Sequence, residues 1–255
     1  MEKISRKSFV KGALGLGAVG ILAGCASSAS STAASASSTA APAEKKEFTF
    51  ADTVRWDAQY DVVVMGMGAA GMVAAKTAAD NGAKVVIVEK CEEGKAGGNT
   101  KVCGQLFAYA NGDKDAAKSY YTALAGGRDI EPEIIDAISE GVANMADILA
   151  DEFGFNKDEY MDWTGVNVGG TNMGAMSPEY PEMPGHEKMA LWTTHAGASD
   201  GYLYQGLKQN VTDRVDAIDV WYSSPAKSLI QDPVTKTVVG VTVERDGKEM
   251  NIRAL

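Results

Sequence analysis

The segment YDVVVMGMGAAGMVAAKTAADNGAKVVIVEK, residues 60–90, decides the fold. Its first six residues form an apolar, β-branched run that predicts a buried parallel strand. A glycine-rich turn follows at 66–71, and the alanine-rich stretch 72–81 predicts a helix that ends at Gly82. Residues 84–89 predict a second buried strand that finishes in an acidic side chain. This order of strand, glycine turn, helix and strand predicts a parallel α/β sheet of the dinucleotide-binding type.

Each glycine of the turn has its own physical task in this pattern. Gly66 permits the tight turn off the strand, Gly68 lets the backbone approach a pyrophosphate, and Gly71 lets the helix pack closely on the sheet. The first N–H groups of the helix face the phosphates. Glu89 follows at close to the ~20-residue spacing expected for the carboxylate that binds the ribose hydroxyls. Because all these parts occur together, the pattern favours a dinucleotide site over a glycine-rich turn without a ligand.

The composition is that of an acidic, globular protein. The chain has 255 residues, 45% of them hydrophobic, which is enough for one sizeable domain. A formal net charge of -10 disfavours nucleic-acid binding, because that function needs basic patches. Cys91 and Cys103 are too few for a disulfide framework, and the sequence has no CxxC or CxxCH spacing. It therefore predicts no zinc, iron–sulfur or attached haem site.

Residues 1–24 have the organisation of a secretory signal. A basic head is followed by the apolar run 12–23, which is shorter than the ~20 residues needed to span a bilayer. The tetrapeptide LAGC at 22–25 resembles a lipobox, which predicts cleavage before Cys25 and lipidation of its thiol; an ordinary cleaved signal is the alternative. Residues 5–11, SRKSFVK, resemble the twin-arginine export motif with a lysine in the second arginine position. Ordinary unfolded export is equally compatible with this segment.

These features predict an exported protein held by a lipid anchor on the outer face of the cytoplasmic membrane. Residues 25–55 would form a stalk, because the stretch up to Ala43 is almost entirely Ser, Ala and Thr and cannot bury enough surface to fold. The folded domain is expected to occupy residues 56–255.

The segment after the second strand resembles the flavoprotein subunits of FAD-dependent fumarate reductases and succinate dehydrogenases. It reads EKC at 89–91, GGNTK at 97–101 and GQ at 104–105. The similarity is strongest to exported bacterial flavocytochrome-type reductases, and it covers only the N-terminal half of such a protein. It implies a Rossmann-like FAD-binding domain in which the GGNTK loop wraps the pyrophosphate. It implies FAD contacts at Gly66, Gly68, Ala69, Ala70, Gly71, Glu89, Lys90, Gly98, Asn99, Thr100, Gly104, Gln105 and Ala226.

Other implications concern the cofactor linkage and nearby side chains. Some family members attach FAD through a histidine in this loop, but the chain has only His186 and His195, so FAD is expected to be non-covalent. His195 is interpreted as a structural or flavin-adjacent residue and not as the proton donor. Cys103 is interpreted as a small buried hydrophobe.

The remaining elements are predicted from periodicity and turn signals. Helices are expected at 113–125, 131–153 and 202–211. Apolar residues recur at helical spacing in the second of these and predict a core-facing stripe: Ile134, Ile135, Ile138, Val142, Met145, Ile148 and Leu149. Residues 165–184 look irregular and are expected to cover the flavin region. A β-meander is predicted from strands at 227–231, 237–245 and 249–255, joined by turns at 234–236 and 246–247.

The resemblance implies an oxidoreductase that transfers a hydride from flavin N5 to the C=C bond of a fumarate-like small organic acid. Electrons would come from a separate donor protein or a membrane quinol pool, and no catalytic residue is assigned. The capping domain of the family has no counterpart, and the strand at 249–255 is expected to leave an open sheet edge. The chain is therefore interpreted as a fragment. A naturally shortened protein is the alternative. Two other functions stay open: a non-catalytic FAD-fold surface lipoprotein that acts as a binding module, and an amine- or acid-oxidising flavoenzyme.

Overall fold

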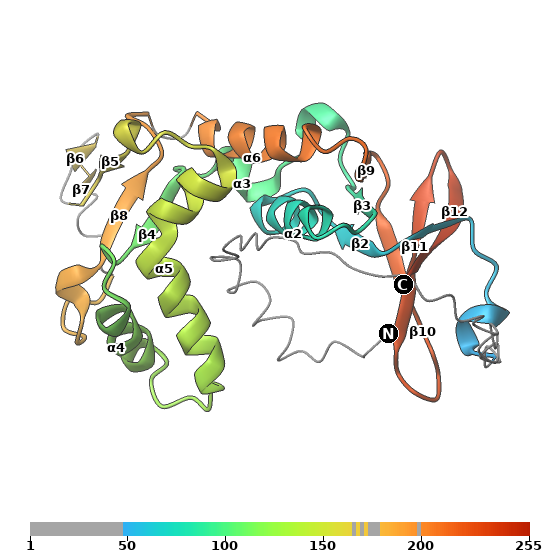
Figure 1. Cartoon of the computed structure of the whole chain (residues 1–255), viewed down its shortest axis with the longest axis horizontal. Helices are drawn as coiled ribbons and strands as arrows, with labels where there is room; N and C mark the ends of the chain where they lie inside the picture. The colour runs from blue at the N-terminus through green and yellow to red at the C-terminus, as the bar shows by residue number, and fades with distance from the viewer. Residues whose placement is uncertain (1–47, 165–166, 169–170, 173–178, 198–199) are drawn as a thin grey trace, which may run out of the picture. The chain divides into compact units, whose positions relative to one another are not determined.

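The computed structural model describes residues 48–164, 167–168, 171–172, 179–197 and 200–255 (Figure 1). The chain divides after Val54 into two units. In the first, the described residues hold one short 3-10 turn, η1 (Phe50–Thr53). The second unit, Arg55–Leu255, contains the predicted domain. The predicted signal and Cys25 lie outside the described residues, and within the described ranges no helix is long and apolar enough to cross a membrane.

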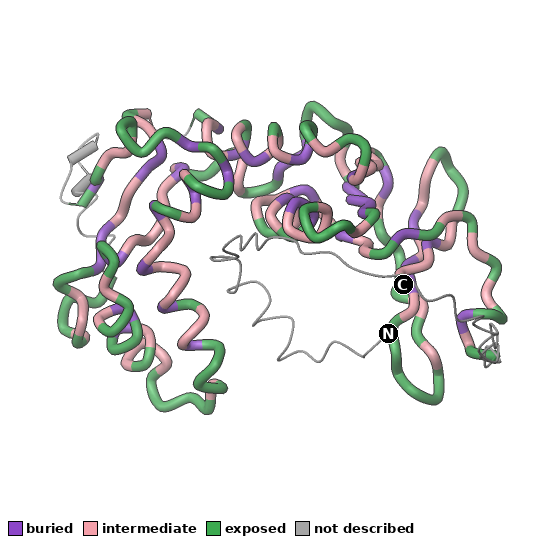
Figure 2. Tube along the Cα trace, viewed as in Figure 1, coloured by how far each residue is buried: buried purple, intermediate pink, exposed green. Residues whose placement is uncertain are grey.

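A parallel sheet forms the centre of the second unit. Its strands are β2 (Val62–Met65), β3 (Val85–Val88) and β9 (Ile218–Trp221), in the order β2–β3–β9. Strand β3 is buried along its whole length because it lies between two strands and carries only Val and Ile (Figure 2). The predicted parallel pairing is therefore confirmed, and so is the burial of β3, whereas β2 is only half-buried and ends in Met65, which is 57% exposed. Strand β9 joins this pair from far along the chain.

The first predicted strand is in fact two strands separated by Asp61. Strand β1 (Ala58–Tyr60) pairs with β12 (Lys248–Ala254) in a different sheet, whereas β2 pairs with β3. The change of partner occurs where the Asp61 carboxylate accepts the Lys84 N–H at 2.7 Å and the Asp61 N–H donates to the Lys84 carbonyl at 2.9 Å. These two bonds hold the chain at the start of β3 while β1 leaves that sheet.

Tyr60 links the two sheets at this point. Its hydroxyl donates to the Asp219 carboxylate of β9 at 2.5 Å, and its ring meets the Trp221 ring edge-on. Burial, with the bond to Asp219, raises the pKa of Tyr60 to about 12. The phenol therefore stays a hydrogen-bond donor at neutral pH.

Helix α2 (Ala69–Asp80) follows the glycine turn and starts earlier than the predicted residue 72. Gly82 lies just past its C-cap with φ +84°, as the sequence predicted for a helix stop. One face of α2 packs on the sheet and the other on α6 (Tyr202–Thr212), which confirms a predicted helix. Met72 and Ala75 contribute to the main core together with Ile87 and Leu207.

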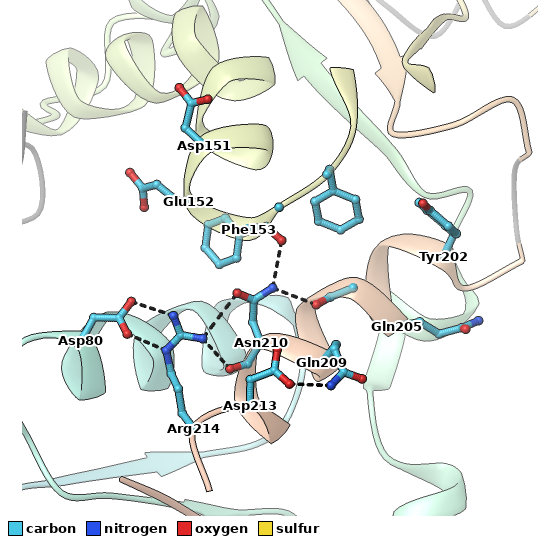
Figure 3. Close-up of a pocket in the computed structure, with 13 residues that line it drawn as sticks. Asp80, Asp151, Glu152, Phe153, Tyr202, Gln205, Gln209, Asn210, Asp213 and Arg214 are labelled. Carbon is cyan, nitrogen blue, oxygen red and sulfur yellow. Dashed lines mark hydrogen bonds and ion pairs between the residues drawn. The ribbon is translucent and has the colours of Figure 1, made fainter. Parts of the chain in front are cut away.

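An ion-pair network fixes α6 against the end of α2 (Figure 3). The Asp80 carboxylate accepts bonds of 2.5 and 3.1 Å from Arg214, which hold the pKa of this carboxyl below its usual value, and the Lys76 ammonium lies 2.7 Å from it. Asn210 donates to the Phe153 carbonyl and so attaches α5 to α6. Asp80, Phe153, Asn210 and Arg214 line an open cavity, which extends along α6 as far as Tyr202.

The β-meander at the C-terminal end is confirmed. Strands β10 (Ala226–Gln231), β11 (Val238–Arg245) and β12 are antiparallel neighbours. Asp246 and Gly247 have φ of 52° and 71°, which is the conformation of a two-residue hairpin. The open edge expected at the last strand is wrong, because β12 lies between β11 and β1 in the order β1–β12–β11–β10.

Helices α4 (Lys114–Leu124) and α5 (Pro132–Phe153) pack together and confirm two more predictions. The predicted core stripe of α5 is partly wrong, because Ile134 and Ile138 are 49% and 42% exposed. The helix buries several small side chains in their place: Ser139, Ala143 and Ala146. Small side chains allow neighbouring elements to approach closely. A prediction made from the spacing of large hydrophobic residues therefore missed this face of α5.

A second antiparallel sheet lies beside α5. It has the order β4–β8–β5, from β4 (Leu106–Tyr109), β8 (Ala190–Thr193) and β5 (Met161–Asp162). Much of the predicted irregular segment 165–184 lies outside the described residues; β6 (Asn167–Val168) and β7 (Thr171–Asn172) pair within it. Three short 3-10 turns complete the described elements: η2 (Glu93–Lys95), η3 (Lys157–Glu159) and η5 (His186–Lys188).

Candidate cofactor site

The glycine turn lies at the carboxyl end of β2. Gly66 has φ +96°, a conformation that favours glycine, so its predicted role in the turn is confirmed. A Cβ on Gly71 would lie 2.0 Å from the Gly66 carbonyl oxygen, so the close approach of α2 to β2 requires glycine there. Gly68 differs, because the nearest heavy atom to a Cβ at that position would be Thr100 Oγ1 at 3.8 Å. The protein leaves room beside Gly68, where the sequence predicted a phosphate.

Glu89 is held in place just past the end of β3. It is 6% exposed; its Oε2 accepts the Met67 N–H and its Oε1 accepts the Cys91 N–H, each at 2.8 Å. Since a carboxylate offers about four lone-pair positions, each oxygen keeps one for a further donor such as a ribose hydroxyl. The acid and the glycine turn therefore form one unit, joined through Met67, which lies between Gly66 and Gly68.

The GGNTK segment is a short helix, α3 (Gly98–Val102), where a loop was expected. Gly97 precedes it with φ +117°, and a Cβ there would lie 2.5 Å from the Tyr204 ring. Thr100 Oγ1 accepts the N–H of Ala69 at 2.9 Å, so α3 lies against the N-terminus of α2. The N–H of Ala69, which was expected to face a phosphate, is engaged by Thr100 in this structure.

Gln105 is completely buried and its side chain turns into the protein. Its Nε2 donates to the carbonyls of Thr100 at 2.7 Å and Cys103 at 3.1 Å, and its Oε1 accepts the Tyr204 N–H at 3.3 Å. Because both amide hydrogens are engaged, a contact of Gln105 with FAD falls to its backbone. The side chain attaches α3 to the first turn of α6, a role that the sequence did not reveal.

Several of the other predicted contacts are exposed residues. Lys90 and Asn99 are exposed, as are Gly98 and Ala226. The Ser224 N–H donates to the Glu89 carbonyl at 2.8 Å, which brings the chain leading to Ala226 beside the acid. Ala70 follows Ala69 in the first turn of α2, and Gly104 directly precedes Gln105. Their contacts with FAD stay predictions.

Cys103 is exposed, so the expectation of a buried position is wrong. It is the C-cap of α3, where the helix ends and the chain turns outward. Two residues of this site were missed by sequence reasoning: Gly97 and Tyr204. The two consecutive glycines at 97–98 could have indicated Gly97. Glycine readily adopts a left-handed conformation and allows another group to pack closely against the backbone.

Residues 61–255 match the family described as the FAD binding domain. The chain belongs to this family. It is 29% identical over 201 residues to an NADH:fumarate oxidoreductase of Klebsiella pneumoniae, a match that covers 75% of this chain and 19% of the relative. It is 40% identical over 86 residues to a 3-oxosteroid 1-dehydrogenase of Mycobacterium tuberculosis, which covers 31% of this chain and 15% of that one.

The fold is shared with a solved 3-ketosteroid Δ1-dehydrogenase from Sterolibacterium denitrificans. The TM-score is 0.62 at 19% identity, over 77% of this chain and 46% of that chain. The chain thus spans less than a fifth of the length of the curated relatives named above. FAD is the cofactor of the family, and the space beside Gly68, the fixed carboxylate of Glu89 and the N-terminus of α2 suit its adenosine and pyrophosphate.

Two alanine substitutions separate folding from cofactor binding at the glycine turn. In Gly68→Ala the methyl group meets no protein atom closely, so the free energy of unfolding of the apoprotein should change by less than about 0.5 kcal/mol. FAD binding should weaken by about tenfold or more, because the methyl group occupies the phosphate side. Gly71→Ala should instead destabilise the apoprotein by about 1–3 kcal/mol. Thermal denaturation and FAD titration measure both effects; wild-type FAD affinity in Gly68→Ala would refute the phosphate assignment.

Replacing Glu89 should affect both the fold and the cofactor. Glu89→Ala leaves two buried N–H groups without an acceptor, which should cost about 1–3 kcal/mol of stability, and removes the ribose acceptor, which should raise the FAD dissociation constant about tenfold. Glu92→Ala is the matched control, since among the described residues that carboxylate pairs with the exposed Lys95 at 2.9 Å. Unchanged flavin occupancy in the purified Glu89 variant would contradict the assignment.

Proposed function

We propose that this chain is the FAD-binding part of an exported oxidoreductase that reduces the C=C bond of a fumarate-like small organic acid. The observation that carries the proposal is the extent of the similarity to the Klebsiella pneumoniae NADH:fumarate oxidoreductase, which covers 75% of the chain. The similarity to the 3-oxosteroid 1-dehydrogenase covers 31%. A relationship that extends along most of the domain supports the fumarate-like activity more strongly than one confined to a single segment.

The bound flavin supplies the hydride chemistry, and the residues of this chain supply its binding and orientation. Glu89 would hold the ribose end and the first turn of α2 would face the pyrophosphate, while α3 would present its exposed surface, including Asn99, beyond Thr100. The Gln105 amide keeps α3 in position, because it bonds both the Thr100 carbonyl of α3 and the Tyr204 N–H of α6. Electrons would reach the flavin from a separate donor protein or a quinol pool.

A second candidate function is the oxidation or reduction of a steroid-like enone. The 40% identity to a 3-oxosteroid 1-dehydrogenase over 86 residues favours it. Both candidates use FAD and an activated C=C bond, so they differ in the size and polarity of the acceptor and not in the cofactor. A small dicarboxylate needs cationic side chains, whereas a steroid needs an extended apolar surface.

The two candidates are separated by the acceptor that reoxidises the reduced protein. The holoprotein, produced together with any coding sequence that continues this chain, is photoreduced without oxygen and mixed with fumarate or with a 3-keto-1,4-diene steroid, while the flavin absorbance is followed. We expect rapid reoxidation by fumarate, with succinate, which lacks the double bond, as the control. Reoxidation by the steroid alone would replace the fumarate proposal with the second candidate. A reduced flavin that reacts with neither would favour the non-catalytic binding module.

We also propose that Cys25 carries a lipid that attaches the exported protein to the outer face of the cytoplasmic membrane. The basic head, the short apolar run and the LAGC sequence support this proposal.

Cys25→Ser should therefore abolish labelling of the protein by radioactive palmitate and release it from the membrane fraction. Cys103→Ser is the matched control, because it removes an exposed thiol of the folded domain and should leave labelling unchanged. Membrane attachment that survives the Cys25 substitution would refute the lipid anchor.

A further inference from the structure

Helix α5 carries an apolar stripe that the described residues cover only in part. Its members follow one another at intervals of four and three residues, so they lie on one face of the helix. The α5 stripe consists of Ile134, Ile138, Gly141, Met145 and Ile148. Ile134 and Ile138 are 49% and 42% exposed, whereas Met145 and Ile148 pack partly against the main core. The stripe therefore begins at the core and continues onto the surface.

Gly141 lies in the middle of the α5 stripe. A glycine inside a helix lowers stability relative to alanine, because its backbone loses more conformational freedom on folding. At Gly206 of α6 the reason for glycine is visible, since a Cβ there would lie 2.4 Å from the Phe155 ring. At Gly141 no described atom lies within 4 Å of a Cβ position. The described part of the fold does not require glycine there, and the space beside it is open to another molecule.

A second helix is the element that fits such a stripe. Side chains spaced by four and three residues form the holes into which a partner helix inserts its own side chains. Two helix axes come closer where the residue at their contact is small, as Gly141 is. At 1.5 Å per residue the α5 stripe is about 21 Å long, which suits a partner helix of about four turns.

The α5 stripe ends at the open cavity between α5 and α6. Glu152 follows Ile148 at the next interval of four residues, and it lines that cavity together with Asp151. Both carboxylates are exposed, and neither forms an ion pair with the other residues drawn there (Figure 3). Asp213, the C-cap of α6, accepts a bond of 2.6 Å from the Gln209 amide. These carboxylates give the end of the stripe an affinity for cations.

The charges of α5 favour a basic partner over a second copy of the same helix. Helix α5 contains no Lys, Arg or His. Its acidic residues are Glu133, Asp136, Glu140, Asp147, Asp151 and Glu152. Three of them already pair with Lys114, Lys118 and Lys157 of neighbouring elements. Two copies of α5 would bring like charges together, whereas a helix with Lys or Arg beside its apolar face would place them near carboxylates.

We propose that the α5 stripe, with the acidic cavity at its end, docks an amphipathic helix of a partner protein that carries basic side chains at one end. The apolar face of that helix packs on the two exposed isoleucines, and its backbone approaches at Gly141. Its Lys or Arg side chains enter the cavity beside Glu152. This docking is independent of FAD and of the acceptor that the flavin reduces.

Two synthetic helical peptides test the surface. Each matches residues 134–152 in length, with leucine along its apolar face and alanine at the position that meets Gly141; one carries lysines at one end and the other glutamates. Fluorescence anisotropy with the purified protein should show binding of the lysine peptide, weakened by added salt, and no binding of the glutamate peptide. Equal binding of the two peptides, or binding of neither, overturns the proposal.

Gly141→Ala separates docking from folding. Since the added methyl group meets open space and improves the helix, the melting temperature of the protein should rise by about 2–4 °C. The same methyl group should weaken binding of the lysine peptide about tenfold, because it keeps the two helices apart. A stabilised variant that binds the peptide normally contradicts the proposed contact.

Ile138→Ser and Glu152→Gln test the apolar and the acidic parts. The first should weaken binding of the lysine peptide about tenfold, and the second about threefold with a smaller dependence on salt. Val234→Ser and Glu249→Gln are the matched controls, because they remove an exposed valine and an exposed carboxylate of the β-meander. Both controls should bind as the wild type does; equal losses in the controls would show non-specific attraction and overturn the proposal.

Two further measurements identify the source of the helix. A dimer in analytical ultracentrifugation that dissociates in Ile138→Ser would assign the α5 stripe to a second copy and overturn the proposal. The peptide titration is also made on the protein produced with any coding sequence that continues this chain, and binding should persist there. Loss of binding in that longer protein would show that the polypeptide covers its own stripe, which would also overturn the proposal.

Discussion

The buried carboxylate of Glu89 connects the parts of the cofactor site. It accepts the N–H of Met67 within the glycine turn and the N–H of Cys91 just beyond it, both at 2.8 Å. Because β2 and β3 are parallel neighbours, these bonds fix the turn relative to the end of β3. The start of α2, and through Thr100 the position of α3, follow from that arrangement. A single side chain thus fixes several parts of the predicted cofactor site relative to one another.

A second layer of polar contacts surrounds α3. Gln105 uses its whole amide to attach α3 to α6, and Gly97 lets the Tyr204 ring pack against the start of α3. Strand β4, which follows this segment, pairs with β8 as far as Leu106 opposite Thr193. Residues from three separate parts of the chain therefore meet around α3. Rigid support of this kind is what a bound cofactor needs for defined geometry.

The differences between expectation and structure have physical causes. The strand at residues 60–65 looked continuous because each residue favours a strand, but the Asp61–Lys84 bonds divide it between two sheets. Ile134 and Ile138 looked like core residues, whereas α5 buries its small side chains. The last strand was expected to be an edge, yet β1 covers it. In each case the strand pairing or the burial depends on which segment packs against these residues. The residue types alone do not specify that segment.

The sequence by itself determined the strand–turn–helix–strand unit, the position of the acid, the longer helices and the Asp246-Gly247 hairpin. These features depend on backbone preferences and periodicity within a few residues, so a local pattern is sufficient to predict them. Only the tertiary structure decided the partner of β12 and the inward orientation of Gln105. These depend on the register between segments far apart in the chain, such as Leu106 opposite Thr193, and that register is fixed by packing.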